Sequence, residues 1–294
     1  MKSLLKNPIV VAGFLLLVLV CVLFNPIIFG GKTFGSSDSL APKAVGIALN
    51  SIQEKTGEFP LWQPWVFSGM PTAEAFTNVS KLYFPDYLSN LFFLPGMIIQ
   101  LLHLLFAGIG GFILLRHFKC SEWAAGLGAV AFMITPYMVT MVVFGHGSQM
   151  MTAAYIPWIL WLTVRLWQNP NLWNTGWLAI LLGFQLQRAH AQIAYYTWLL
   201  IGAYSLLILI NGIRNSEDRS NIGKGFGLFS LACLIGIGIS LLIYLPAMEY
   251  TPFSVRGGSA GGGADYNYAT GWSFHPKEIL TFFIPSAFGF GGQP

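Results

Sequence analysis

Charged side chains are scarce in this sequence. Only 9% of its 294 residues are Asp, Glu, Lys or Arg, against roughly 25% in a typical soluble domain. Apolar residues make up 55% of the chain, and so few charges cannot cover a water-soluble globule with that much apolar surface. The composition excludes a soluble enzyme, a disordered chain and a nucleic-acid-binding protein. It predicts a polytopic membrane protein for which lipid replaces most of the water.

Cysteine is also scarce, and its placement excludes a disulfide framework. The three cysteines, Cys21, Cys120 and Cys233, lie in or beside apolar runs, and none lies in the long polar loops. The motifs His-Glu-x-x-His, Cys-x-x-Cys and Gly-x-x-x-x-Gly-Lys-Ser/Thr are absent, and the one Gly-x-Ser-x-Gly match, 257–261, lies in the glycine-rich polar stretch after 247, which does not predict a strand–turn–helix elbow. Zinc protease, ATPase and serine hydrolase functions therefore have no support, and no residue pattern calls for a metal or a cofactor.

Seven apolar runs separate the polar segments of the chain. A membrane-spanning helix needs about 20 apolar residues, within a range of about 17–25. We therefore expect an all-α transmembrane domain over 1–294 with about seven spans, of which the fourth and fifth are marginal in length. The candidate spans are 8–29, 91–115, 123–144, 150–166, 172–187, 193–211 and 225–246.

The basic residues predict the orientation of these spans. With the amino terminus in the cytoplasm, the cytoplasmic segments carry eight basic and three acidic residues, and the outer segments carry seven and eight. Lys and Arg are enriched in cytoplasmic loops, most clearly here in 211–224. We expect a multi-pass protein of the cytoplasmic membrane, with 31–90 as its first extracytoplasmic loop and 247–294 as a further outer segment. Because the sequence stops at Pro294 in what reads as a loop, we expect this segment to begin a longer carboxyl-terminal part.

The first outer loop carries the leading candidate for catalysis. Val45, Leu49 and Ile52 recur at helical spacing and predict a short amphipathic helix along the membrane surface, with Ser39 as its cap. Asp38 stands at the start of this segment, where a carboxylate is a candidate general base or acid. The alternative interpretation is that Asp38 only caps the helix.

Further polar side chains interrupt the apolar runs at the outer helix ends. His146 lies in Gly145-His-Gly147, where the glycines let the backbone approach a ligand closely. If 187–192 is helical, Arg188 and Gln192 share one face, and an arginine holds a lipid phosphate through two hydrogen bonds. The alternatives are a polar turn residue for His146 and an interfacial arginine that extends to water for Arg188.

Three more residues complete the set of candidates. His190 is a candidate ligand of the same phosphate. Glu249 and Arg256 flank the end of the seventh span, where they either pair with each other or supply a second carboxylate and a second phosphate ligand. Burial of an ionisable group in a bilayer is unfavourable, so these groups predict a site that faces outward.

Several segments, in a fixed order, carry a family resemblance. They are Gly57-Glu-Phe-Pro-Leu-Trp-Gln-Pro-Trp-Val-Phe-Ser-Gly-Met-Pro71, Gly145-His146 with Ala154-Tyr-Ile-Pro-Trp158, His190-Ala-Gln-Ile-Ala-Tyr-Tyr196, and Leu245-Pro246 with Glu249 and Ser254-Val-Arg-Gly-Gly258. Together they resemble bacterial membrane proteins of the YfhO type, which are similar to the GT-C class of membrane glycosyltransferases. The resemblance implies a many-helix enzyme that takes a sugar from a polyprenyl-phosphate carrier outside the membrane. It also implies an acidic residue in the first outer loop, a position that Asp38 fits.

The resulting hypothesis is transfer of a sugar from a polyprenyl-phosphate donor to a cell-envelope glycan acceptor. Asp38 deprotonates or orients the acceptor hydroxyl. The groups expected to neutralise the leaving phosphate are Arg256 and Arg188, with His146 or His190. The expected partners are membrane lipids, the lipid-linked sugar donor and the acceptor glycan, with no nucleic acid. The alternatives are a non-catalytic envelope transporter or flippase-like protein, which charges in mid-helix would favour, and a structural membrane protein.

Overall fold

A computed structural model describes residues 7–65, 69–72, 83–214, 219–254, 266, 270–271, 273–284 and 286–289. These residues are mostly helical, with one pair of two-residue strands among them, which confirms the prediction of a helical protein. The elements are α1 (Pro8–Leu23), α2 (Asn25–Ile28), α3 (Ser37–Thr56), β1 (Trp62–Gln63), β2 (Met70–Pro71), α5 (Phe84–Leu91), α6 (Gly96–His117), α7 (Glu122–Met133), α8 (Pro136–Val143), α9 (Gly147–Ala154), α10 (Ile156–Gln168), α11 (Leu172–Gln187), α12 (Ala191–Arg214), α13 (Arg219–Tyr250), η2 (Thr251–Phe253) and η3 (Pro276–Phe282).

Four helices in the described part of the chain are long and apolar enough to cross a membrane, which supports a membrane protein. They are Gly96–His117, Glu122–Val143, Ala191–Arg214 and Ser220–Phe253. They correspond to the second, third, sixth and seventh predicted spans. At the other three predicted spans the helices are shorter, with 16 residues in α1, 13 in α10 and 16 in α11. The count of seven spans therefore stays a prediction.

Prolines interrupt three of the predicted spans. Proline has no N–H to donate to the carbonyl four residues earlier, and its ring clashes with that carbonyl. At these three places the helix therefore ends, and the next helix begins with proline in its first turn. The restarts are Asn25-Pro26 within 8–29, Pro136 within 123–144 and Ile156-Pro157 within 150–166. Hydropathy alone does not reveal the break at Pro136, because α7 and α8 on its two sides are equally apolar.

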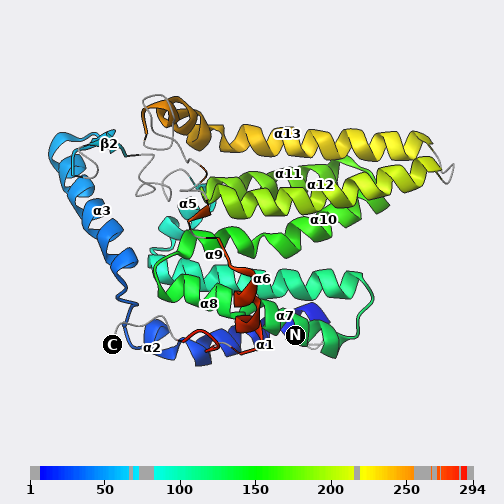
Figure 1. Cartoon of the computed structure of the whole chain (residues 1–294), viewed down its shortest axis with the longest axis horizontal. Coiled ribbons are helices and arrows are strands. Elements are labelled where there is room, and N and C mark those ends of the chain that lie inside the picture. Colours follow the sequence, from blue (N-terminus) through cyan, green and yellow to red (C-terminus); the bar gives the residue numbers. More distant parts are fainter. Residues whose placement is uncertain are drawn as a thin grey trace. The chain divides into compact units, whose positions relative to one another are not determined.

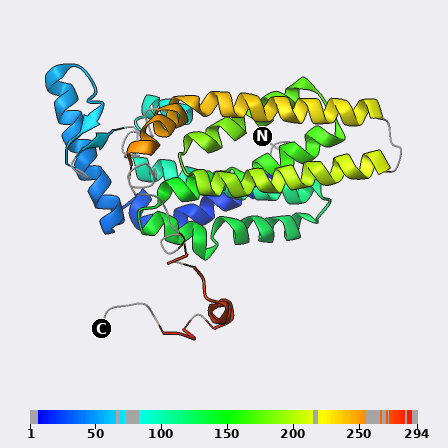
Figure 2. The same ribbon diagram turned by 45° about the horizontal axis from the view of Figure 1, so that its top comes forward.

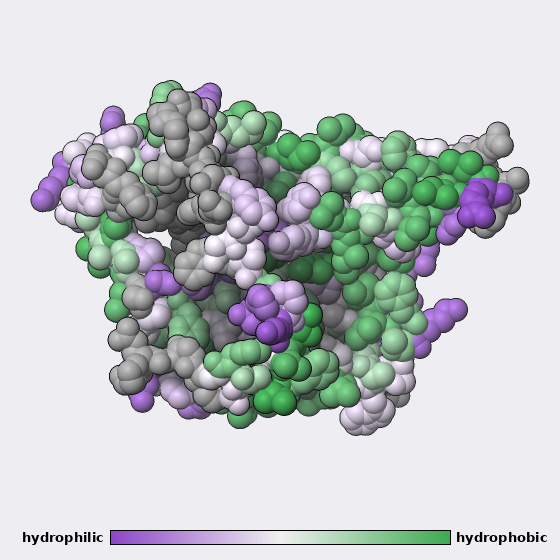
Figure 3. Space-filling view, in the orientation of Figure 1, coloured by the Kyte–Doolittle hydropathy of each residue, from purple (hydrophilic) through white to green (hydrophobic). Residues whose placement is uncertain are grey.

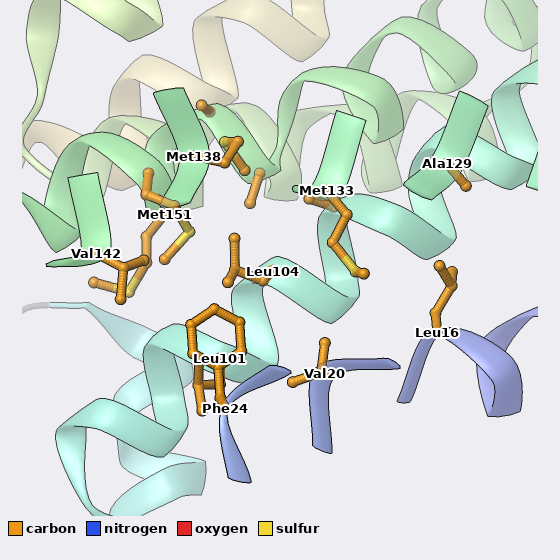
Figure 4. Close-up of a cluster of buried hydrophobic side chains, with 14 of the residues drawn as sticks. Leu16, Val20, Phe24, Leu101, Leu104, Ala129, Met133, Met138, Val142 and Met151 are labelled. Atoms are coloured by element: carbon orange, nitrogen blue, oxygen red, sulfur yellow. The ribbon is translucent and has the colours of Figure 1, made fainter. Parts of the chain in front are cut away.

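The amino-terminal helices pack around one buried apolar cluster. Figure 4 shows Leu16 and Val20 of α1, Leu104 of α6 and Met133 of α7 converging on it. Gly108 of α6 permits this approach, because a Cβ there would lie 3.0 Å from the Met133 sulfur and 3.2 Å from a Leu16 methyl carbon. α6 is thus the shared partner of α1 and α7.

A second apolar cluster joins α10, α11, α12 and α13, which run in similar directions in both ribbon views (Figures 1 and 2). Within it, α11 and α13 approach closely. A Cβ on Gly183 would lie 2.7 Å from the side chain of Ile239, and one on Gly236 would lie 2.8 Å from the Cβ of Leu182. Small residues on both helices let the two backbones approach closely.

α3 lies at one end of this bundle and is steeply inclined to the long helices (Figures 1 and 2). The predicted helix in the first outer loop is therefore present, but its predicted cap is wrong. Ser36 occupies the N-cap position, and Ser39 lies one turn inside, where its hydroxyl donates to the Ser36 carbonyl at 2.8 Å. The Ser39 hydroxyl therefore donates to a backbone carbonyl, whereas a capping side chain would accept from a backbone N–H. After α3, β1 and β2 pair antiparallel, with Trp62 opposite Pro71 and Gln63 opposite Met70.

The opposite end of the bundle carries the basic loops. The carboxyl ends of α6 and α10 meet there through a hydrogen bond of 2.8 Å between His117 and Gln168. The start of α13 packs beside them, since a Cβ on Gly225 would lie 3.1 Å from the Trp167 ring. The basic residues at or next to these ends are Arg116, Lys119, Arg165, Arg214 and Lys224. In Figure 3 the right half of the surface is mainly hydrophobic, and its hydrophilic residues gather towards the right-hand end.

The chain divides into two compact units, 1–245 and 246–294. The boundary lies one residue before the predicted outer segment 247–294. Within the second unit, His275 accepts a hydrogen bond from the Lys277 backbone at 3.2 Å, and Glu278 accepts one from the His275 backbone at 3.0 Å. This reciprocal pair of bonds caps η3.

Candidate functional site

Asp38 and His146, more than 100 residues apart in the sequence, meet at a glycine. Gly145 has a φ of 88°, in the left-handed region that favours glycine. A Cβ at this position would lie 2.5 Å from the Ser39 nitrogen and 2.7 Å from the Asp38 carbonyl carbon. The turn between α8 and α9 therefore packs directly against the first turn of α3, and only glycine allows that contact.

This contact sets up an acid–base pair. His146 Nε2 lies 3.2 Å from Asp38 Oδ2, and the two side chains are 42% and 58% exposed. Asp38 lies in the first turn of α3, and His146 is the N-cap residue of α9. Neither N-cap residue, Ser36 of α3 or His146 of α9, caps its helix with a side-chain hydrogen bond among the described residues, and both helix dipoles favour negative charge there. Both side chains are therefore accessible to solvent, and the Asp38 carboxylate lies near the positive ends of two helix dipoles.

His190 is a third member of this group. It lies in the connector between α11 and α12, which turns sharply because Ala189 adopts a φ of 55°. Burial lowers the pKa of His190, and the nearby His146 lowers it further. Its Nδ1 is buried without a hydrogen-bond partner among the described residues. No group of three potential ligands in this part of the chain lies close enough to hold a metal ion.

The other candidates do not join this group. α11 ends at Gln187 and α12 begins at Ala191, so the helical face expected to be shared by Arg188 and Gln192 does not form. Gln192 is exposed, and its amide donates to the Tyr196 hydroxyl at 3.0 Å. Glu249 is exposed in the last turn of α13 and belongs to the second compact unit. Arg256 lies outside the described residues.

Arg188 instead forms a buried ion pair with the first outer loop. Only 6% exposed, it places Nη1 3.7 Å from Asp86 Oδ2, and Asp86 is also 6% exposed. The guanidinium carbon lies 4.5 Å from the centre of the Tyr83 ring, a cation–π contact. Burial raises the pKa of the Asp86 carboxyl, and the Arg188 guanidinium opposes that rise. Arg188 is therefore held by protein groups and is not displayed to solvent as a phosphate ligand.

Hydrogen bonds extend this arrangement across the bundle. The fully buried Tyr83 hydroxyl lies 2.9 Å from His103 Nε2 on α6 and also contacts the Tyr155 hydroxyl. Gln187 accepts from the Phe84 backbone N–H at 3.3 Å and donates to the Ile239 carbonyl of α13 at 3.0 Å. The end of the first outer loop is thus inserted between α6, α11 and α13.

We refer to Arg188, Asp86, Tyr83, His103 and Tyr155 as the Arg188 cluster. It lies at the same end of α6 as the Asp38–His146 pair. A Cβ on Gly147, next to His146, would lie 2.6 Å from the Gln100 side-chain oxygen, and His103 stands one turn further along α6. The two groups are thus joined through a single helix.

Most of the Arg188 cluster is missing from the sequence-based prediction. His103 carried a usable signal, because an ionisable residue within an apolar span is unfavourable unless it has a partner. Asp86 and Tyr83 carried none, because Tyr83-Phe-Pro-Asp86 reads as an ordinary polar turn. Their burial depends on a long-range contact with Arg188 that local patterns do not encode.

Comparison of the chain with protein-family models, with curated proteins and with solved structures found no match. The structure describes a helical membrane protein with a partly exposed Asp–His pair and, on the same helical framework, a buried Arg–Asp pair.

Proposed function

We propose that this protein is a membrane glycosyltransferase of the GT-C type that acts on the extracytoplasmic side, with the Asp38–His146 pair as its proton acceptor. The 3.2 Å contact between the two side chains, with both partly exposed, is the observation that supports this function most directly. A carboxylate that contacts an imidazole holds the ring in place and stabilises it when it becomes charged. The resemblance of the sequence to YfhO-type proteins supplies the reaction class.

In the proposed reaction the acceptor hydroxyl oxygen forms a bond to the anomeric carbon of the donor sugar. The bond from that carbon to the phosphate oxygen breaks, and the polyprenyl phosphate leaves with the electron pair. The hydroxyl proton passes to the Asp38–His146 pair. Because phosphate is a good leaving group, oriented positive charge near it matters more than a general acid.

Positive electrostatic potential for the donor phosphate is proposed to come from two sources. The amino ends of α3 and α9 converge at Gly145, and helix amino ends favour anions. His146 and His190 add positive charge when they are protonated.

A non-catalytic transporter or flippase-like protein is the second candidate, and the Arg188 cluster favours it. Buried ionisable groups on the framework of membrane-spanning helices mark substrate or ion pathways in many transporters. Such a protein would need Arg188 and Asp86 but would not need a proton acceptor at Asp38. The two candidates therefore predict different effects of an Asp38 variant.

The test is sugar transfer by the purified chain in nanodiscs, measured as polyprenyl phosphate released from a labelled polyprenyl-phosphate sugar. Asp38→Asn should lower the rate by about 10²–10⁴-fold, the usual contribution of a positioned acid or base. The matched control is Glu54→Gln, which makes the same change on an exposed position of the same helix and should retain the wild-type rate. An Asp38→Asn variant with full activity and normal folding would remove the proposed catalytic role.

A further inference from the structure

An arginine at the basic end of the bundle is held by an aromatic ring and not by a hydrogen bond. The guanidinium carbon of Arg165 on α10 lies 5.2 Å from the centre of the Trp161 ring, in a cation–π contact. Arg165 is exposed, and no N–H of its guanidinium meets an acceptor in the part of the chain that the structure describes. Its donors are therefore available to a ligand.

Another arginine at this end is already engaged. Arg116 near the end of α6 donates from Nη1 to the Cys120 carbonyl at 2.6 Å, and its Nη2 lies 3.8 Å from a Glu122 carboxylate oxygen. Among the described residues, no carboxylate forms an ion pair with Arg165. Arg165 thus keeps its charge for an external anion.

Arg165 belongs to a row of α10 side chains that follows α6. One face of α10 carries, at spacings of three and four residues, Trp158, Trp161, Arg165 and Gln168. At the start of this row, the Trp158 indole donates to the Phe106 carbonyl of α6 at 2.8 Å. At its end, Gln168 Oε1 lies 2.8 Å from His117 Nε2 of α6. Both ends of the row contact α6, so Arg165 lies beside that helix.

Gln168 adds a second donor. Its Oε1 only accepts, so His117 Nε2 carries the proton of their hydrogen bond. The Gln168 amide nitrogen keeps both of its N–H groups for other acceptors, and Gln168 is exposed. Arg165 and Gln168 are separated by about 4.5 Å along the helix axis and share one face, so both reach the same anion.

The two donors lie where apolar helix surface meets the basic loops. α10 ends at Gln168, and α6 beside it is long and apolar enough to cross a membrane. Exposed tryptophans lie at the same end, Trp123 in the first turn of α7 and Trp173 in the first turn of α11. Because tryptophan is enriched at the level of the lipid head groups, a ligand of Arg165 is expected at that level.

Charge narrows the choice of ligand. A guanidinium binds a phosphate through two parallel hydrogen bonds. The exposed Lys119 and Lys224 belong to the same end. Such basic residues attract a lipid with net negative charge and repel the choline group of phosphatidylcholine.

From this geometry we propose that Arg165 and Gln168 bind the phosphate of an anionic phospholipid, with phosphatidylglycerol as the lipid to test. The guanidinium donates to two phosphate oxygens, the Gln168 amide donates to the same phosphate, and the acyl chains follow the apolar surface of α6 and α10. The site lies at the opposite end of the bundle from the Asp38–His146 pair and does not depend on the proposed sugar transfer.

The experiment titrates the full chain in detergent micelles with phosphatidylglycerol and with phosphatidylcholine of the same acyl chains, and counts bound lipids by native mass spectrometry. Phosphatidylglycerol should bind about 10-fold more tightly, because the choline cation is repelled. Phosphatidylglycerol with a photoreactive diazirine in its head group should label residues 113–119 and 161–168. Equal affinities of the two lipids, or labelling confined to other segments, would overturn the proposal.

Two glutamine variants locate the site. Arg165→Gln should weaken phosphatidylglycerol binding about 10-fold, because it removes the charge-assisted hydrogen bonds. Arg214→Gln removes the same charge from an exposed position at the same end and should change binding by less than about 2-fold. Arg214 lies about 13 Å along α12 from Ser205, which accepts a hydrogen bond from Trp167 of α10, and a charge at that distance is largely screened in physiological salt. Equal losses in the two variants would mean that only the net charge of this end attracts the lipid, which contradicts the proposal.

A soluble competitor separates a lipid site from a general anion site. Excess glycerol phosphate should not displace the lipid, and displacement by this soluble head group would contradict a phospholipid site. Thermal unfolding checks that the variants are folded; if Arg165→Gln is not, the lipid preference and the labelling of the wild type decide. Lipid binding should persist in Asp38→Asn, so loss of sugar transfer and loss of lipid binding are distinguishable.

Discussion

At the scale of single residues, the Arg188–Asp86 pair is a buried ion pair. Both residues are 6% exposed, and Arg188 Nη1 lies 3.7 Å from Asp86 Oδ2. A buried ion pair adds little net stability over apolar residues, because desolvation offsets its attraction. Loss of one partner, in contrast, strongly destabilises the fold, because it leaves the other charge buried without a partner. The pair therefore fixes how the first outer loop attaches to the helices.

We predict that Arg188→Leu lowers the free energy of unfolding by about 3–5 kcal/mol, because Asp86 is left buried without its cation. The double variant Arg188→Leu/Asp86→Leu should lose less than Arg188→Leu alone. Denaturant titration of the purified protein in detergent measures both. Strictly additive losses would show that the two side chains do not interact.

His190 predicts how stability depends on pH. Because burial lowers the pKa of His190, the unfolded chain binds the proton more readily than the folded chain. The stabilising contribution is complete above the ordinary histidine pKa of about 6.5 and is lost as the pH falls through the lowered value. Thermal unfolding between pH 7.5 and 5 should show this decline, and His190→Gln should make it shallower. A decline that is equally steep in the variant argues against the assignment.

At the scale of elements, the fold depends on a few glycines that let helices touch. A Cβ on Gly110 of α6 would lie 2.4 Å from Trp158 Nε1. That indole N–H donates to the Phe106 carbonyl at 2.8 Å, and the ring stacks on Phe106. In the described part of the chain, in contrast, a Cβ on Gly202 of α12 would meet no atom within 4 Å outside the backbone of its own helix.

These two glycines predict effects of opposite sign. Gly110→Ala should destabilise the protein by about 1–3 kcal/mol, the usual range for overpacking, because the indole has to move. Gly202→Ala should stabilise it by about 0.5–1 kcal/mol, because alanine is the better helix former. Thermal unfolding of the two variants provides the comparison. Similar shifts in both would mean that the α6–α10 contact does not depend on Gly110.

Much of the element order follows from the sequence, for a physical reason. Apolar runs of helical length identify the helices near 96–117, 191–214 and 219–250, since hydropathy is a local property. The observed helix ends differ from the predicted ends where a proline or a backbone turn terminates the helix, as at Pro136 and Ala189. The candidate site was predictable as a set of residue types, but its pairing was not. Asp38 meets His146 because of the tertiary contact at Gly145, which no local pattern reports.

At the scale of the whole molecule, the long helices separate two chemically different ends. The basic loops lie at one end, and the Asp38–His146 pair lies at the end where α3 crosses the bundle (Figure 1). Since Lys and Arg are enriched in cytoplasmic loops, the basic end is expected to face the cytoplasm. The proposed function requires the other end to face outward.

The most direct test of this account is the side of the membrane on which each end lies. Cys21, Cys120 and Cys233 are replaced by serine, and single cysteines are placed at Glu54 on α3 or at Gly223 on α13, both exposed positions. In intact cells a membrane-impermeant maleimide should label Glu54→Cys, and it should label Gly223→Cys only after permeabilisation. Labelling of both from the same side, or of Gly223→Cys alone from outside, would contradict an outward-facing Asp38–His146 site.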